Sequence, residues 1–311
     1  MAAWCAPTST RWAKTINLEI SPRLDGGGFV IVRFMTFTDR LNARIAQVNS
    51  RLCLGLDPRP AMHPNTANGD RRAVHRHCEG ILEACAPVIA AVKPNLAYFE
   101  ALGVLGMKVL EELCSTARDL GIPIILDAKR GDFPASAEAY ASAWLTGSHA
   151  GDAITVNPFL GFETLTPFFE AASANGGAVF TLVKTSNPGS ADLQDLETAH
   201  GTVSDIIARH LETLTQTHSG VVGAVVGATH TAQLAHFRAL MPNAVLLLPG
   251  LGAQGARAAD LEPAFRKDGS GALASSSRAI QYASSGKDYA SAAKAAATAM
   301  RDELNTALGL S

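Results

Sequence analysis

The segment Asp127-Ala128-Lys129-Arg130-Gly131-Asp132 contains the residues of this sequence best suited to chemistry. A lysine between two carboxylates is held in its charged form, because each nearby negative charge stabilises the ammonium. Such a lysine can stabilise developing negative charge and then donate a proton. Lys93 would extend the group into a network of alternating charge. The alternative is a structural ion-pair network, with Asp132 capping a helix that begins near Pro134.

Two further segments are suited to binding phosphate. Residues 250–255 have the sequence Gly-Leu-Gly-Ala-Gln-Gly, and residues 275–278 have the sequence Ser-Ser-Ser-Arg. Backbone N–H groups in glycine-rich turns and at helix N-termini bind phosphate, and Arg278 would add a bidentate guanidinium. Glycine turns usually only reverse the chain, so the occurrence of both segments together is what indicates a phosphorylated ligand.

Short apolar runs alternate with amphipathic stretches from residue 52 onward, which is typical of repeated βα units. Strands are expected at 52–56, 88–92, 122–126, 153–156, 178–183, 221–226, 244–248 and 271–275. Helices are expected near 70–86, 97–120, 134–149, 163–175, 200–218, 231–240, 257–268 and 286–308.

Eight βα units in series predict an α/β fold, a single-domain (β/α)8 TIM barrel. Its active site would lie at the carboxyl ends of the strands. The side chains at these ends are polar: Asp57, Lys93, Asp127, Lys129, Asn157, Lys184, Thr185, Ser186, Thr229, Gln254 and Arg278. A doubly wound open sheet is the alternative, but Asp57-Pro58-Arg59-Pro60 stands where its glycine-rich fingerprint would follow the first strand.

The barrel domain is expected over residues 35–311. Residues 1–34 have no helical or strand periodicity, so we expect a disordered N-terminal extension or a misassigned start, with Met35 as the natural first residue. An organelle-targeting segment is the alternative. Thr36-Phe37-Thr38-Asp39 has the pattern of a helix N-cap and precedes an apolar-periodic stretch.

Composition excludes several classes of function. The 311 residues carry a formal net charge of −2, without the basic field that nucleic-acid binding usually needs. The five cysteines form no C-x-x-C pair, which argues against a disulfide framework and a zinc ribbon. His75 and His77 point in different directions on a helix and cannot share a metal. No apolar run reaches the ~18 residues that span a membrane. We therefore expect a cytoplasmic protein with no metal, nucleic-acid or membrane partner.

Seven motifs occur in order, each at the end of an expected strand. They are residues 54–58 (LGLDP), 92–95 (VKPN), 126–132 (LDAKRGD), 155–158 (TVNP), 185–189 (TSNPG), 249–255 (PGLGAQG) and 277–280 (SRAI). With these motifs, residues 35–310 resemble the orotidine 5′-phosphate decarboxylase family, specifically its longer bacterial subgroup. The resemblance implies decarboxylation of orotidine 5′-monophosphate to uridine 5′-monophosphate and CO₂, the last step of de novo UMP synthesis, without a cofactor.

The resemblance also implies a role for individual residues. The charged catalytic network would be Lys93, Asp127, Lys129 and Asp132, with Lys129 as the general acid that protonates C6. The substrate-binding residues would be Asp57 for the ribose hydroxyls, Ser186 for the pyrimidine ring, Gln254 and Arg278 for the phosphate, and also Ser136 and Asn157.

A homodimer with shared active sites is expected, because in the family the residue at Asp132 reaches the site of the neighbouring subunit. Two positions depart from the usual family pattern. Phe133 stands where isoleucine is common, and Ser136 stands where a threonine contacts the ligand. Ser136 keeps the hydroxyl, whereas Phe133 could alter packing between subunits.

Two rival functions remain open. A related barrel shares D-x-K-x-x-D but decarboxylates a sugar phosphate with magnesium; it places an acidic ligand at the end of the second strand, where Lys93 stands here. The other rival is a catalytically silent barrel that only binds nucleotide monophosphates. Loss of a lysine or an aspartate from the network would be its mark, and all four residues are present.

Overall fold

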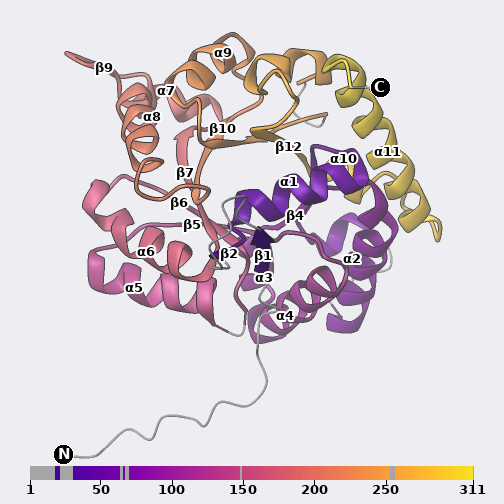
Figure 1. Ribbon diagram of the computed structural model, residues 1–311. Coiled ribbons are helices and arrows are strands. Elements are labelled where there is room, and N and C mark those ends of the chain that lie inside the picture. The colour runs from indigo at the N-terminus through magenta and orange to yellow at the C-terminus, as the bar shows by residue number, and fades with distance from the viewer. Residues whose placement is uncertain are drawn as a thin grey trace, which may run out of the picture. The chain divides into compact units, whose positions relative to one another are not determined.

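The computed structural model describes residues 18–21, 31–63, 66, 70–147, 149–252 and 256–310 (Figure 1). The chain divides into two units, residues 1–35 and residues 36–311. In the first unit, strands β1 (Leu18–Ser21) and β2 (Ile31–Phe34) pair antiparallel. The rest of the extension predicted over residues 1–34 lies outside the described residues. No helix in the described ranges is long and apolar enough to cross a membrane.

Eight parallel strands form one sheet in the second unit, in the order β4-β3-β12-β11-β10-β7-β6-β5. They are β3 (Leu52–Leu56), β4 (Ala91–Pro94), β5 (Ile125–Arg130), β6 (Ala153–Val156), β7 (Ala178–Lys184), β10 (Val222–Val226), β11 (Val245–Pro249) and β12 (Ala272–Ser276). Isolated parallel bridges, Val92 to Ile124 and Asn95 to Asp127, join the β4 and β5 edges. The predicted (β/α)8 barrel is confirmed, and the doubly wound alternative is wrong.

The helices of the second unit surround this sheet (Figure 1). They are α1 (Phe37–Val48), α2 (Arg71–Cys85), α3 (Leu96–Glu100), α4 (Gly103–Asp119), α5 (Pro134–Ala141), α6 (Thr166–Asn175), α7 (Ala191–Gln194), α8 (Val203–Leu214), α9 (Thr231–Leu240), α10 (Arg278–Gln281) and α11 (Tyr289–Ala307). A two-stranded hairpin, β8 (Glu197–Thr198) and β9 (Gly201–Thr202), precedes α8.

Helix α1 closes the amino end of the barrel. Thr36 caps it with the predicted capping box, in which Thr36 and Asp39 bond each other's backbone N–H groups. Phe37, Leu41 and Ile45 belong to the same buried cluster as inward-facing strand residues such as Phe180. The rings of Phe37 and Phe180 meet edge to face with centroids 5.8 Å apart. The carboxyl ends of the strands therefore remain as the open end of the barrel.

Two predicted helices differ in the structure because of single residues. The helix expected over 97–120 is divided into α3 and α4, since Gly103 adopts a φ of +67° that interrupts the helical path. The helix expected over 257–268 is a 3₁₀ helix, η7 (Ala258–Ala264), that contains Pro263. Proline cannot donate the backbone hydrogen bond that an α-helix interior requires.

The second and third strands begin later than predicted. A 3₁₀ turn, η3 (Ala86–Val88), occupies the start of the strand expected over 88–92. Pro123 stands within the strand expected over 122–126, and β5 begins at Ile125. A proline cannot donate to the hydrogen-bond ladder of a central strand. Both shifts place charged residues inside the strands: Lys93 lies within β4, and Asp127 lies within β5.

Candidate active site

Asp127 lies between two lysines at the open end of the barrel. Lys93 on β4 donates from Nζ to Oδ2 of Asp127 at 2.7 Å. Lys129 at the end of β5 donates from Nζ to Oδ1 of Asp127 at 2.5 Å. The sequence predicted a lysine between two carboxylates. Within one chain the structure instead places a carboxylate between two lysines.

The pKa values of Asp127 and Lys93 favour the charged form of both side chains. Burial opposes ionisation of Asp127, but the charges and hydrogen bonds of Lys93 and Lys129 outweigh it and hold the pKa of Asp127 well below its usual range. Burial would lower the pKa of Lys93, yet the charges of Asp127 and Asp57 raise that pKa above its usual value. The buried pair is therefore ionised at neutral pH.

The backbone at Lys129 explains how this side chain returns to Asp127. Lys129 has a φ of +49°, a left-handed conformation that is uncommon for residues other than glycine. The register of β5 against β6 shifts between Leu126 and Arg130. The side chains of Asp127 and Lys129 converge as predicted, but through an irregular strand end and not through the regular alternation of a strand.

Thr155 on β6 completes the hydrogen bonds around this strand end. Its hydroxyl donates to Oδ1 of Asp127 at 3.1 Å and accepts from the backbone N–H groups of Ala128 and Lys129 at 3.0 and 2.9 Å. Thr155 lies within the motif of residues 155–158, from which no role for its side chain was predicted. The one feature of the sequence that could have indicated a role for Thr155 is that it is a polar residue inside an otherwise apolar strand.

Asp132 and Ser136 do not join the network of their own chain. One carboxylate oxygen of the half-buried Asp132 accepts from the backbone N–H of Phe133 at 2.8 Å. Among the residues that the structure describes, Asp132 has no ion pair. Phe133, not Asp132, is the N-cap of α5, so the alternative of a capping aspartate is wrong. Ser136 lies exposed in the first turns of α5.

Asp57 and Ser186 follow β3 and β7 at the same end of the barrel. Oδ1 of Asp57 is buried and has no hydrogen-bond partner among the described residues. The hydroxyl group of Tyr282 donates to the backbone oxygen of Asp57 at 2.9 Å. Ser186 is closely approached by Gly227, where an added Cβ would lie 2.8 Å from the Cα of Ser186. These contacts hold the backbones of Asp57 and Ser186 in place.

Asn157 follows β6 and is engaged with the backbone around Lys129. Its Nδ2 donates to the carbonyl oxygen of Lys129 at 3.3 Å, and its Oδ1 accepts from the N–H of Phe159 at 3.1 Å. Lys184, predicted only as a polar strand end, lies fully buried with its Nζ 2.6 Å from Oδ2 of Asp195. This ion pair ties the segment after β7 to the strand that it follows.

The two segments expected to bind phosphate follow the paired strands β11 and β12. Gly250 and Gly252 have φ values of +121° and +78°, which only glycine adopts readily. Arg278 is exposed at the start of α10, and no described residue forms an ion pair or hydrogen bond with its guanidinium. Gln254 lies outside the described residues.

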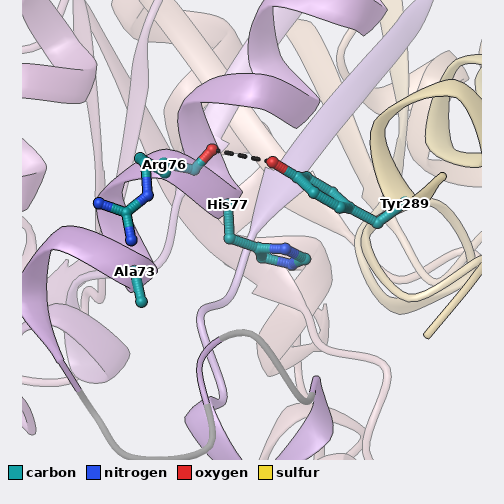
Figure 2. Close-up of a pocket in the computed structure, with 4 residues that line it drawn as sticks. All are labelled: Ala73, Arg76, His77 and Tyr289. Carbon is teal, nitrogen blue, oxygen red and sulfur yellow. Dashed lines mark hydrogen bonds between the residues drawn. The ribbon is translucent and has the colours of Figure 1, made fainter. Parts of the chain in front are cut away.

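A pocket of about 320 Å³ lies beside helix α2 and is lined by Ala73, Arg76, His77 and Tyr289 (Figure 2). The hydroxyl group of Tyr289 donates to the backbone oxygen of Arg76 at 3.3 Å. None of the four lining residues belongs to the charged network. In the described ranges, no group of three or more histidine, cysteine or acidic side chains could hold a metal ion.

Residues 50–295 match the model of the orotidine 5′-phosphate decarboxylase / HUMPS family. The chain is 55% identical to an orotidine 5′-phosphate decarboxylase of Deinococcus radiodurans, over 88% of this chain and 99% of the relative. It is 41% identical to the Roseiflexus castenholzii protein of the same name, with the same coverage. The Leishmania donovani OMP decarboxylase structure superposes with a TM-score of 0.76 at 36% identity, covering 89% of this chain and 100% of that chain.

Proposed function

We propose that Lys129 is the group that protonates C6 of the substrate in this chain, which belongs to the orotidine 5′-phosphate decarboxylase family. The reaction converts orotidine 5′-monophosphate to uridine 5′-monophosphate and CO₂ in pyrimidine biosynthesis. The supporting observation is the difference between the two lysines on Asp127. The side chain of Lys129 is 48% exposed, whereas that of Lys93 is 6% exposed. Lys129 is therefore the lysine that a substrate at the open end can contact.

The bond between C6 and the carboxyl group breaks, the electron pair stays on C6, and CO₂ leaves. No ring position delocalises this charge well, so the ammonium of Lys129 stabilises it electrostatically. Lys129 then transfers a proton from Nζ to C6 and later regains a proton from solvent. Asp127 faces the departing carboxylate, and the repulsion between these like charges is relieved as CO₂ leaves.

The remaining predicted residues bind the substrate in this proposal. Asp57 binds the ribose hydroxyls, a role supported by its buried oxygen without a partner. Ser186 binds the pyrimidine ring, and Arg278 with Gln254 binds the phosphate. Ser136 and Asn157 complete the substrate contacts, and the engaged amide of Asn157 also supports the backbone of Lys129. Phosphate binding far from C6 supplies binding energy that holds the reacting group in place.

Replacing Lys129 with alanine tests this proposal. We expect kcat on orotidine 5′-monophosphate, followed by absorbance, to fall by about 10²- to 10⁴-fold, the usual range for loss of a general acid. Lys108→Ala, which removes an exposed lysine from α4, is the matched control and should keep the activity of the unaltered enzyme. A Lys129→Ala enzyme with near-normal kcat would exclude the general-acid role.

A simple assay distinguishes the proposed function from its rival, a magnesium-dependent sugar-phosphate decarboxylase. The charge of Lys93 at the end of β4 repels a cation, and this supports chemistry without a metal ion. Activity on orotidine 5′-monophosphate should therefore survive a chelator. The silent nucleotide-binding barrel would show no loss of substrate absorbance at any enzyme concentration.

A homodimer with shared active sites is the second part of the proposal. Asp132 has no ion pair among the described residues, and large apolar side chains are exposed on the segments after the adjacent strands β5 and β6. Phe133 is 69% exposed and Phe159 is 81% exposed. Exposed apolar groups next to a site residue are typical of an interface, and a second copy would cover them and receive Asp132.

Mixing two inactive variants tests the shared site. Lys129→Ala and Asp132→Asn subunits, unfolded together and refolded, should form hybrid dimers that contain one intact site. Activity should then exceed that of either variant refolded alone. A mixture that stays as inactive as its parents, with hybrids present by mass spectrometry, would exclude the contribution of Asp132 to the partner subunit.

The catalytic domain in this proposal spans residues 35–311, and the enzyme is cytoplasmic. The division of the chain near residue 35 supports the boundary. The four described cysteines are free and buried, which suits a reducing compartment.

A further inference from the structure

We infer that Thr155 is a positioning residue of this reaction, whose hydroxyl group holds both the carboxylate of Asp127 and the backbone turn that directs Lys129. This inference rests on the roles proposed for Asp127 and Lys129. Thr155 lies on β6, next to the strand end that bears both residues, and is 1% exposed. It acts through its neighbours and not on the substrate.

Every hydrogen-bonding site of the Thr155 hydroxyl is used. A hydroxyl group has one proton to donate and two lone pairs to accept. The proton goes to Oδ1 of Asp127 at 3.1 Å, and the lone pairs accept from the N–H groups of Ala128 at 3.0 Å and Lys129 at 2.9 Å. A fully satisfied buried group of this kind specifies one local geometry.

The irregular end of β5 needs such a partner. Regular pairing of β5 with β6 is interrupted between Leu126 and Arg130, and Lys129 adopts a φ of +49°. The N–H groups of Ala128 and Lys129 bond the Thr155 side chain in place of a strand carbonyl. Buried N–H groups without a partner are costly, so the hydroxyl stabilises the left-handed turn that aims Lys129.

The same hydroxyl also orients Asp127. Oδ1 of Asp127 accepts from both Thr155 and Lys129, while Oδ2 accepts from Lys93. Three donors from three strands therefore define the rotation of one carboxylate. Because threonine is β-branched and restricted at χ1, its hydroxyl direction is fixed by the strand. Thr155 couples the position of the proposed general acid to the orientation of its carboxylate partner.

The test compares Thr155→Val with a matched substitution. Valine keeps the shape of threonine but leaves the N–H groups of Ala128 and Lys129 without their partner and removes one of the two donors to Oδ1 of Asp127. Thr181→Val is the control: Thr181 is fully buried on the adjacent strand β7, and its hydroxyl has no hydrogen-bond partner among the described residues. Both changes remove one buried hydroxyl, but only the first touches the network.

We expect Thr155→Val to lower kcat by about a hundredfold, as a small misplacement of a reacting group does, while KM changes little. Thr155→Ser, which restores the hydroxyl, should recover most of the kcat. Thr181→Val should match the unaltered enzyme. A merely structural role for Thr155 would lower the melting temperature without this separation of kcat from KM and without recovery by serine.

An unchanged kcat in Thr155→Val, or equal losses in Thr155→Val and Thr181→Val, would overturn the inference. If Thr155→Val does not fold, Thr155→Ser and Thr155→Ala test the inference instead. Equal kcat values in these two variants would show that the hydroxyl group has no positioning role. Lys129→Ala is measured in parallel. Retained activity in Lys129→Ala would exclude the proposed general-acid role of Lys129. Retained activity in Thr155→Val alone would exclude only the positioning role of Thr155.

Discussion

The three side chains in direct contact at Asp127 carry charges that do not cancel. Lys93 and Lys129 both contact the single carboxylate of Asp127, so these three side chains together carry a net positive charge. Orotidine 5′-monophosphate carries a phosphate and a carboxylate, and a positive cluster at the open end of a barrel attracts such an anion. The proposed contribution of Asp132 from a second subunit would then balance the charge of Lys129.

Arg278→Ala should raise KM for orotidine 5′-monophosphate by about tenfold to a hundredfold, because a hydrogen bond to a charged phosphate is worth roughly 1.5–3 kcal/mol. The melting temperature should not change, since the exposed guanidinium has no partner among the described residues. Steady-state kinetics and thermal unfolding measure the two effects.

Arg118→Ala is a control for the loss of an arginine. Arg118 is exposed in the last turn of α4, and helices of a βα unit end near the amino ends of the strands, away from the open end. KM should stay unchanged in this variant. An Arg278→Ala enzyme with an unaltered KM would remove Arg278 from the phosphate site.

At the scale of elements, the ends of adjacent strands shape the site by close packing. β10 follows β7 in register until a shift between Val225 and Val226, and the N–H of Gly227 then bonds the carbonyl oxygen of Lys184 at 2.7 Å. This brings Gly227 against the backbone of Ser186, with no space for a side chain. The glycine thus sets the position of the segment that carries the proposed ring contact.

Gly227→Ala should displace this segment and lower kcat/KM for orotidine 5′-monophosphate. The added Cβ would lie 2.8 Å from the backbone nitrogen and Cα of Ser186, which cannot move as a flexible side chain would. Overpacking of this kind costs about 1–3 kcal/mol of stability. Kinetics and the free energy of unfolding in urea would both report the change.

Gly189→Ala is the matched control in the same segment. A Cβ at Gly189 would meet only side-chain atoms of Asn187 and Asp192, at 3.4 and 3.5 Å, which is an ordinary contact distance. Its kcat/KM should equal that of the unaltered enzyme. Equal effects of the two substitutions would show that the segment tolerates no change at all, and the specific argument for Gly227 would fail.

At the scale of the whole second unit, one buried histidine links stability to pH. The His77 ring lies beside the Tyr289 ring with centroids 4.7 Å apart (Figure 2) and beside the His63 ring at 4.4 Å. Neither ring nitrogen of His77 has a hydrogen-bond partner among the described residues. Burial, with a smaller effect of His63, lowers the pKa of His77 to about 4. His77 is therefore neutral in the folded protein.

Stability should fall as pH decreases from about 6.5, the usual pKa of an unfolded histidine, to about 4. Across this range the unfolded chain binds a proton at His77 that the folded chain does not. The contribution of the neutral ring is complete above pH 6.5 and is lost as pH approaches 4. His77→Phe keeps an aromatic ring and removes the proton site, so its melting temperature should depend less on pH across this window.

Melting temperatures of the unaltered protein and of His77→Phe between pH 8 and pH 4 measure the contribution of His77 to the pH dependence of stability. The value at pH 8, where His77 is neutral in both states, provides the internal reference for the change in packing. Parallel curves for the two proteins would show that other groups cause the acid sensitivity.

The architecture and much of the proposed site follow from local patterns. Apolar runs at regular spacing predicted all eight barrel strands, because a strand buried on both faces is apolar throughout. The capping box at Thr36 predicted the start of α1, because capping depends on residues three positions apart. Lys93, Asp127 and Lys129 were recognised as a group because each one follows or ends a strand.

Features that depend on how separate strands align could not be predicted from local sequence patterns. The left-handed turn at Lys129, the three hydrogen bonds of Thr155 and the ion pair of Lys184 with Asp195 join atoms whose distance is set by strand register. Register results from packing across the whole sheet, and no local pattern encodes it. The sequence thus determined which chemical groups meet at the open end of the barrel, whereas folding determined that Asp127 lies between two lysines.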